Sequence, residues 1–236
     1  MSKAQIPLSE EIPRQMTGSA EPLGIVTTRF VLYTAGLLGA FALLPHAMIH
    51  GDVLVFKEGG IVEWMQFGLL ALACGWMLAN SLRLPQFRAL LCVMALGIVM
   101  AMVRELDSLL DKLIPVLGWK LPCGVILAVL LFVAWRNRRA LVPQISAFIT
   151  CRGFAILWAG FAVAVPFAQL VGHGNFLQII MGDDYVRDYK RVIEELGEVF
   201  GYLLLVIGSV ESTLQMAVLQ RNAKPTTPRA VIEGSS

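Results

Sequence analysis

Six long apolar stretches constrain this chain more than any other feature of its sequence. An α-helix needs about 20 mostly apolar residues to cross about 30 Å of hydrocarbon. Each stretch approaches that length, although the third and fourth are shorter. We therefore predict an all-α, polytopic membrane helical bundle with six transmembrane helices. The predicted spans are Phe30–Ile49, Ile61–Leu82, Phe87–Val103, Leu121–Trp135, Gly153–Val171 and Val199–Leu219.

Composition agrees with this class and excludes others. Hydrophobic residues make up 57% of the chain and charged residues 15%, whereas soluble domains contain about 25% charged residues. The formal net charge is only +2, too even for a surface that follows nucleic-acid phosphates. The predicted partner is therefore the lipid bilayer, and nucleic acid is excluded.

The ends of the chain differ from its middle. Residues 1–28 are polar and rich in proline, which predicts a disordered arm, and residues 221–236 predict a disordered tail. The first residues lack the pattern of a cleaved signal peptide. Residues 29–220 are predicted to form the six-helix transmembrane domain, with an outer interfacial helix near residues 183–195.

Basic residues indicate the orientation of the predicted bundle. Most of the 19 Lys and Arg residues fall on one side of it, and the densest group lies between the fourth and fifth spans. Because short loops rich in Lys and Arg stay in the cytoplasm, both termini are predicted to be cytoplasmic. We expect a multi-pass protein of a bacterial inner membrane. The densest basic group is Arg136, Arg138, Arg139 and Arg152.

Acidic residues and histidines show the opposite distribution. Most of the 17 Asp and Glu residues, and all three histidines, fall at the outer ends of the predicted spans. The rule that places basic residues inside says little about Asp and Glu, so this crowding is not a by-product of topology. It predicts a polar pocket that opens toward the periplasm.

Helix periodicity predicts which of these groups face the interior. His46 and His50 lie four residues apart on a face with small residues, as do Glu194 and Glu198 on the last span. Small residues mark contacts between membrane helices, so both pairs are predicted to point inward. Glu195 falls at the edge of the lipid-facing stripe and is expected at the headgroups.

Two histidines at this spacing can bind one metal ion. The hypothesis is a site for a divalent metal, for example zinc, formed by His46 and His50 with Glu194 and Glu198. The alternative is that the histidines cap the end of their helix while the carboxylates pair with basic side chains. Three histidines near one face of a membrane resemble the zinc ligands of membrane-embedded zinc hydrolases such as alkaline ceramidases. The resemblance is in residue type and not in position along the chain. That family pairs histidines on its last helix, whereas this chain pairs them on its first.

The third span ends in a charged sequence with two readings. Glu105 or Asp107 could act as general base for a metal-bound water, and the Arg104 guanidinium suits an anionic group. The chain would then be a metal-dependent hydrolase of a membrane-derived or amphiphilic substrate. The alternative is a salt bridge that holds helices in register.

Glu211 lies inside the last span, away from this pocket. A carboxyl group within the membrane is a candidate proton carrier or ion ligand. The second functional hypothesis is thus a proton- or cation-coupled transporter that uses Glu211. The third is a non-catalytic subunit that associates with a membrane protein partner or forms a homo-oligomer.

Overall fold

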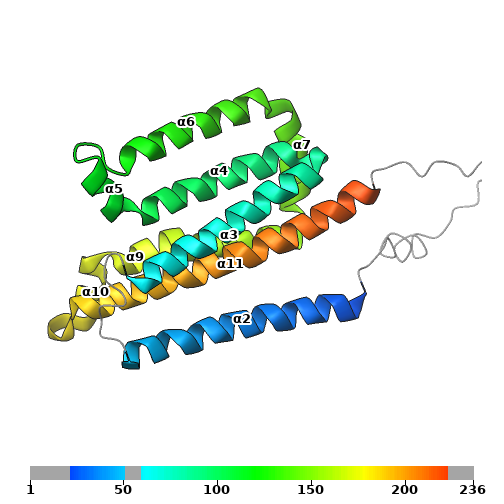
Figure 1. Cartoon of the computed structure of the whole chain (residues 1–236). Coiled ribbons are helices and arrows are strands. Elements are labelled where there is room, and N and C mark those ends of the chain that lie inside the picture. Colours follow the sequence, from blue (N-terminus) through cyan, green and yellow to red (C-terminus); the bar gives the residue numbers. More distant parts are fainter. Residues whose placement is uncertain (1–21, 51–59, 223–236) are drawn as a thin grey trace, which may run out of the picture. The chain divides into compact units, whose positions relative to one another are not determined.

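A computed structural model describes residues 22–50 and 60–222, and these residues are all-α (Figure 1). The chain divides into two units, Met1–His46 and Ala47–Ser236. Each unit is described by itself.

The first unit contains all but the last four residues of the helix α2, Leu23–His50. This helix begins inside the segment predicted to be a disordered arm. Three threonine hydroxyls along it donate hydrogen bonds of 2.8–2.9 Å to the carbonyl four residues earlier. Such bonds satisfy hydroxyl groups within their own helix, as a lipid environment requires. Residues Leu23–Ala42 are long and apolar enough to cross a membrane.

The second unit begins with a hairpin of two long helices, continues through a series of shorter helices and ends in a long last helix. Short 3₁₀ turns precede α4 and α11 at Pro85–Phe87 and Gly182–Asp184. The helices are α3 (Ile61–Arg83), α4 (Arg88–Glu105), α5 (Asp107–Leu113), α6 (Lys120–Arg136), α7 (Arg138–Ile149), α8 (Arg152–Ala162), α9 (Ala168–Gly172), α10 (Gly174–Met181) and α11 (Arg187–Asn222).

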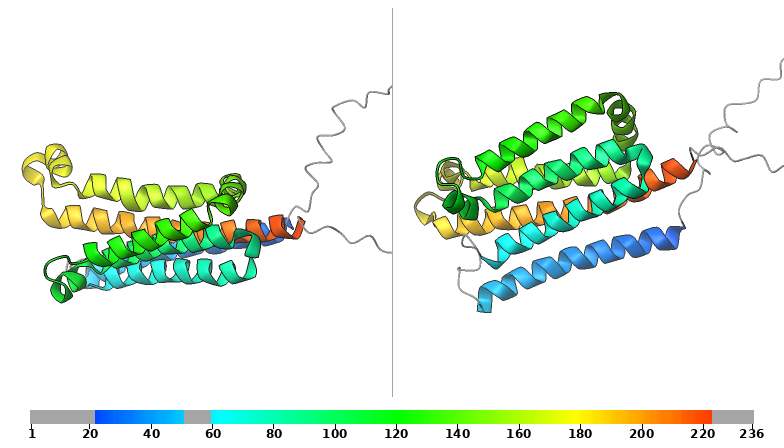
Figure 2. Two further views of the ribbon diagram at one scale, coloured as in Figure 1. Left: turned by 90° about the horizontal axis from the view of Figure 1, so that it is seen from above. Right: turned by 45° about the horizontal axis from the view of Figure 1, so that its top comes forward.

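The long helices of this unit form an arc. Along it, α6 packs on α4, α4 on α3, α3 on α11, and α11 on α8 and α9. The views in Figure 2 show α6 and α8 at the two ends of the arc, with α7 crossing between them at one end of the bundle. Side chains of α3, α4, α6, α8 and α11 line a cavity on the inner side of this arc.

Five helical segments of the described chain are long and apolar enough to cross a membrane. One is in α2, and the second unit supplies the other four. The fourth predicted span, Leu121–Trp135, is not among them and corresponds to α6, whose 17 residues extend about 25 Å, short of the roughly 30 Å hydrocarbon layer. A six-span topology with both termini in the cytoplasm remains a prediction. The four segments of the second unit are Ile61–Arg83, Pro85–Glu105, Arg152–Gly172 and Lys190–Asn222.

Glycines bring α8 and α11 into close contact. A Cβ atom added to Gly201 would lie 2.5 Å from the backbone nitrogen of Ala164, and one added to Gly208 would lie 2.7 Å from the backbone nitrogen of Leu157. Small residues permit this approach between membrane helices. The prediction that the glycine face of α11 points into the bundle is confirmed.

Two segments differ from a simple series of straight helices. Residues Val163–Phe167, which contain Pro166, form a π-helical turn between α8 and α9, because proline cannot continue regular α-helical hydrogen bonding. The predicted interfacial helix near residues 183–195 runs without a break into the last span, because residues 187–195 are the first turns of α11, a continuous helix of 36 residues; its position at the membrane interface remains a prediction.

Candidate functional site

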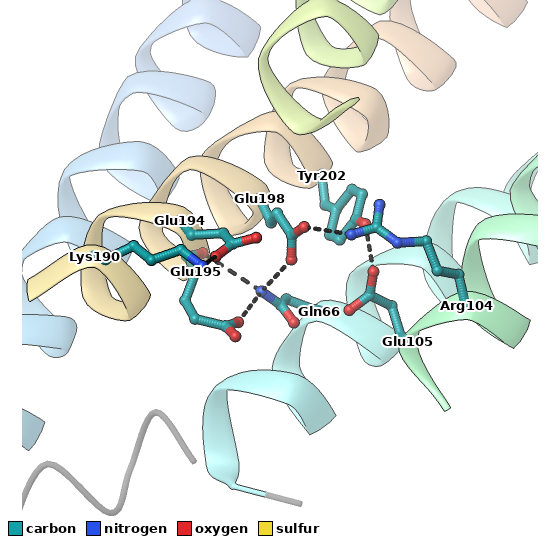
Figure 3. A network of polar contacts seen from close by, with 8 residues as sticks. All are labelled: Gln66, Arg104, Glu105, Lys190, Glu194, Glu195, Glu198 and Tyr202. Carbon is teal, nitrogen blue, oxygen red and sulfur yellow. Dashed lines mark hydrogen bonds and ion pairs between the residues drawn. The ribbon is translucent and has the colours of Figure 1, made fainter. Parts of the chain in front are cut away.

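A polar cavity of about 270 Å³ lies at one end of the second unit. It is bordered by the beginning of α3, the end of α4 and the first turns of α11. Helices α3 and α4 follow each other in the sequence and α11 is far from both, but α3 packs on α4 and on α11, so the polar ends of the three helices meet (Figure 3). The cavity is lined by Glu63, Gln66, Arg104, Glu105, Asp107, Arg187, Lys190, Arg191, Glu194, Glu195 and Glu198.

An ion pair between Arg104 and Glu198 joins α4 to α11. The Arg104 Nη2 atom donates a hydrogen bond of 2.9 Å to Glu198 Oε1. The Glu198 side chain is 6% exposed and that of Arg104 is 34% exposed. The carboxylate is thus held inside the bundle, as its helix face predicted, while the guanidinium borders open space.

Gln66 of α3 connects to the same helix. Its side chain is fully buried, and its Nε2 atom donates to Glu195 Oε2 at 2.7 Å and to Glu198 Oε2 at 3.4 Å. Glu195 therefore faces α3 and the cavity, so its predicted direction toward the lipid-facing stripe was wrong. The helix wheel considered one buried stripe, whereas α11 packs on α8 with one side and on α3 with another.

The carboxyl group of Glu105, at the end of α4, is held by Tyr202, which lies one turn after Glu198 in α11. The Tyr202 hydroxyl donates to Glu105 Oε1 at 2.6 Å, and both residues are buried. A hydrogen bond of this length falls in the range of O–H donors to carboxylates. Sequence reasoning missed Tyr202 and Gln66. The available signal was their spacing, because Tyr202 follows Glu198 by four residues and Gln66 follows Glu63 by three.

The other predicted acidic residues lie nearer the opening of the cavity. Glu194 pairs with Lys190, with 3.9 Å between its Oε2 and the lysine Nζ. It also lies against Gly172, where a larger side chain would overlap it. Asp107 is exposed at the start of α5, because α4 ends at Glu105 and a new helix begins after Leu106.

The charges that line the cavity do not balance. Six of its side chains are carboxyl groups and four are basic. Arg104 donates to Glu198 and Lys190 pairs with Glu194, so these two cations are already beside a carboxylate. The excess of two acidic side chains makes the cavity a site that favours positive charge.

A second, apolar cavity of about 510 Å³ fills the inside of the arc. We call it the apolar groove. Its lining comes from α3, α4, α6, α8 and α11 and includes Met94, Gly97, Cys123, Phe154, Trp158, Phe161 and Leu205. Arg104 lines both this groove and the polar cavity, and Tyr202 lies in the groove wall. The two spaces therefore meet at the end of α4.

The structure leaves the predicted metal site undecided. His46 and His50 are in the last turns of α2, whose side chains lie outside the described residues. Within the described part of the chain, no group of three or more His, Cys, Asp and Glu side chains could hold a metal ion. The pairing of these histidines with Glu194 and Glu198 remains a prediction.

Glu211 lies in another part of α11, well away from the polar cavity. It is 3% exposed, and its neighbours Ser209, Ser212 and Thr213 are also buried. The Thr213 hydroxyl accepts a hydrogen bond of 2.8 Å from the indole of Trp76. Glu211 is thus an interior carboxyl group, and its role in proton or ion coupling remains a prediction.

Comparison of the chain with protein-family models, curated proteins and solved structures gave no match.

Proposed function

We propose that this protein is an integral membrane protein that binds an amphiphilic, membrane-derived molecule. The hydrocarbon chain of the ligand occupies the apolar groove, and its head group occupies the polar cavity. The observation that carries the proposal is the position of Arg104, which lines both spaces. A ligand that fills both must be apolar at one end and polar at the other.

The size and lining of the apolar groove support this assignment. Its volume of about 510 Å³ lies within the roughly 300–1,000 Å³ of typical ligand pockets. Trp158 and Phe161 belong to its lining and are 60% and 45% exposed. Exposed aromatic side chains on a candidate span face lipid, so a hydrocarbon chain can enter the groove sideways from the bilayer.

The distribution of arginines supports an extracytoplasmic position for the head group. The connection between α3 and α4 and the segment around α7 contain Arg83, Arg88, Arg136, Arg138 and Arg139, and they lie at the end of the bundle opposite α5 and α10 (Figure 1). Basic loops favour the cytoplasm. The polar cavity, at the other end, would then open toward the periplasm of a bacterial cell.

The predicted hydrolase chemistry would act on this same ligand. Asp107 is exposed at the cavity and could serve as general base, and Arg104 could orient an anionic group. Glu105 is the less accessible base because it accepts the Tyr202 hydroxyl. The metal that would supply the attacking water depends on His46 and His50.

Filling the apolar groove tests the proposal. A Cβ atom added to Gly97 meets nothing within 4 Å, so Gly97→Leu places its side chain in the groove without a backbone clash. The matched control is Gly124→Leu, because Gly124 is exposed on α6, is outside the groove lining and also has open space around an added Cβ.

Binding is measured by native mass spectrometry of the detergent-purified full chain. The probes are palmitoyl lysophosphatidylethanolamine and palmitoyl lysophosphatidylcholine. We expect Gly97→Leu to weaken binding about tenfold or more, equivalent to about 1.4 kcal/mol, and Gly124→Leu to match the wild type. If neither probe binds the wild type, or if both variants bind equally well, the proposal is wrong.

A further inference from the structure

The side-chain oxygen of Gln66 lacks a hydrogen-bond donor. Gln66 is fully buried and lines the polar cavity. Its Oε1 atom has no hydrogen-bond partner among residues 22–50 and 60–222. Buried polar atoms are seldom left unpaired, because an unmade hydrogen bond costs the full desolvation of the group. This oxygen therefore calls for a donor from outside the described chain.

The orientation of the carboxamide is fixed by its neighbours. Its Nε2 atom lies 2.7 Å from Glu195 Oε2 and 3.4 Å from Glu198 Oε2. It also lies 3.4 Å from the backbone carbonyl oxygen of Glu195, which can only accept a hydrogen bond, so turning the carboxamide over would set its oxygen against an acceptor. The oxygen must lie on the other side, and Figure 3 shows it on the side of Glu105.

The groups around this oxygen are acceptors. Glu105 Oε1 already receives the Tyr202 hydroxyl, and Glu195 receives the Gln66 amide. The guanidinium of Arg104 donates to Glu198 instead. A group that donates hydrogen bonds, needs none in return and carries positive charge fits this position, because acidic side chains outnumber basic ones in the lining. A primary ammonium has three N–H donors and no acceptor.

We infer that the head group of the ligand carries a primary ammonium that donates to Gln66 Oε1, between Glu105 and Glu195. This inference rests on the proposed function. The order of the sites specifies the ligand further. Arg104 lies between the apolar groove and Gln66, and guanidinium groups bind phosphate and carboxylate well. The ligand is therefore a zwitterionic amphiphile with an anionic group between its hydrocarbon chain and its terminal ammonium.

Two lysophospholipids separate hydrogen bonding from charge. Palmitoyl lysophosphatidylethanolamine has an ammonium with N–H donors, whereas palmitoyl lysophosphatidylcholine has the same chain, phosphate and charge without them. We expect the wild-type full chain to bind the ethanolamine probe about tenfold or more tightly, the effect of one hydrogen bond to a charged group. In Gln66→Met the two affinities should agree to within about twofold.

The matched control is Gln86→Met, which makes the same substitution at an exposed site in the connection between α3 and α4. This variant should keep the wild-type preference. Equal binding of the two probes by the wild type would overturn the inference and leave the proposed function standing. A preference for the ethanolamine probe that persists in Gln66→Met would also overturn the inference, because a residue other than Gln66 would then bind the ammonium.

Two further outcomes are decisive. If neither probe binds the wild type, the proposed function and this inference both fail. If Mn²⁺ binds the wild type in equilibrium dialysis, is lost in Gln66→Met, and the two lipids bind alike, the acceptors hold a metal ion and the ammonium assignment is wrong.

Discussion

Removing the Tyr202 hydroxyl isolates the contribution of one buried hydrogen bond. Tyr202→Phe keeps the ring, which is 2% exposed, and deletes the group that lies 2.6 Å from Glu105 Oε1. Glu105 is itself 8% exposed, so water cannot readily replace the lost donor. The expected result is a lower free energy of unfolding.

Two measured ranges bound the effect. Hydrogen bonds to charged groups contribute about 1.5–3 kcal/mol in soluble proteins. Side-chain hydrogen bonds in a membrane protein average about 0.6 kcal/mol and reach about 1.7, because the unfolded chain in lipid also finds partners. The Tyr202–Glu105 bond is short and buried, which puts it at the upper end of the second range. We expect a loss of about 1–2 kcal/mol, or a five- to thirty-fold change in the folded-to-unfolded ratio.

The assay is equilibrium unfolding of the purified protein by sodium dodecyl sulfate in mixed micelles. Tyr185→Phe is the control, because Tyr185 lies just before α11 and outside the cavity lining. In a Glu105→Leu background, where the acceptor of the hydrogen bond is gone, Tyr202→Phe should lower the free energy of unfolding only slightly. Two results would contradict the assigned strength of the Tyr202–Glu105 hydrogen bond. One is a loss of unfolding free energy in Tyr202→Phe no larger than that in Tyr185→Phe, and the other is an undiminished loss in the Glu105→Leu background.

Three further predictions concern packing, coupling and metal. Gly201→Ala should lower the free energy of unfolding by about 1–3 kcal/mol, because its Cβ would meet backbone 2.5 Å away. Gly197→Ala, whose Cβ has a nearest neighbour at 3.8 Å, should cost nothing; equal effects would contradict this packing. If Glu211 carries protons, proteoliposomes of Glu211→Gln should lose a proton flux that the wild type shows with a pH-sensitive dye, whereas unchanged flux tells against that role. Elemental analysis should find a stoichiometric divalent metal that a His46→Ala/His50→Ala double variant loses; metal-free protein, or metal retained in the variant, would remove the predicted metal site.

Much of the fold follows from apolar length and helix periodicity. Stretches of about 20 apolar residues predict membrane helices, and the structure has five such segments in its described part. The face of α11 that contains Glu198 was assigned correctly, because small residues on that face mark helix contacts. Apolar length does not decide whether α6 crosses the membrane, because a helix of 17 residues is at the lower limit of the length that spans a bilayer.

The detailed site required tertiary structure. A helix wheel gives one buried direction, but α11 contacts α8, α9 and α3, so Glu195 is also covered. The partners of Glu195 and Glu105 are Gln66 and Tyr202, which come from different helices. No spacing along one helix predicts which residues of another will meet it. The apolar groove could not be predicted from the sequence either, because apolar side chains that line a groove do not differ in type from those that face lipid.

The groove and the cavity together define the architecture of the proposed binding site. Apolar residues of α4, α6 and α8 form one compartment, charged ends of α3, α4 and α11 form the other, and Arg104 lies where they meet. Isolated charges in a protein interior are costly. Their pairing to each other, with one buried acceptor left over on Gln66, explains how the cluster is tolerated and where a ligand would attach.

Photoaffinity labelling locates the hydrocarbon chain of the bound ligand. A lysophosphatidylethanolamine with a diazirine at the end of its acyl chain is cross-linked to the purified full chain, and the labelled peptides are mapped by mass spectrometry. If the hydrocarbon chain occupies the apolar groove, the labels will lie on groove residues such as Met94, Phe154 and Phe161. Gly97→Leu should then lose this labelling. Labels spread over lipid-facing residues such as Leu131 and Phe132 of α6, unchanged by Gly97→Leu, would contradict binding in the groove.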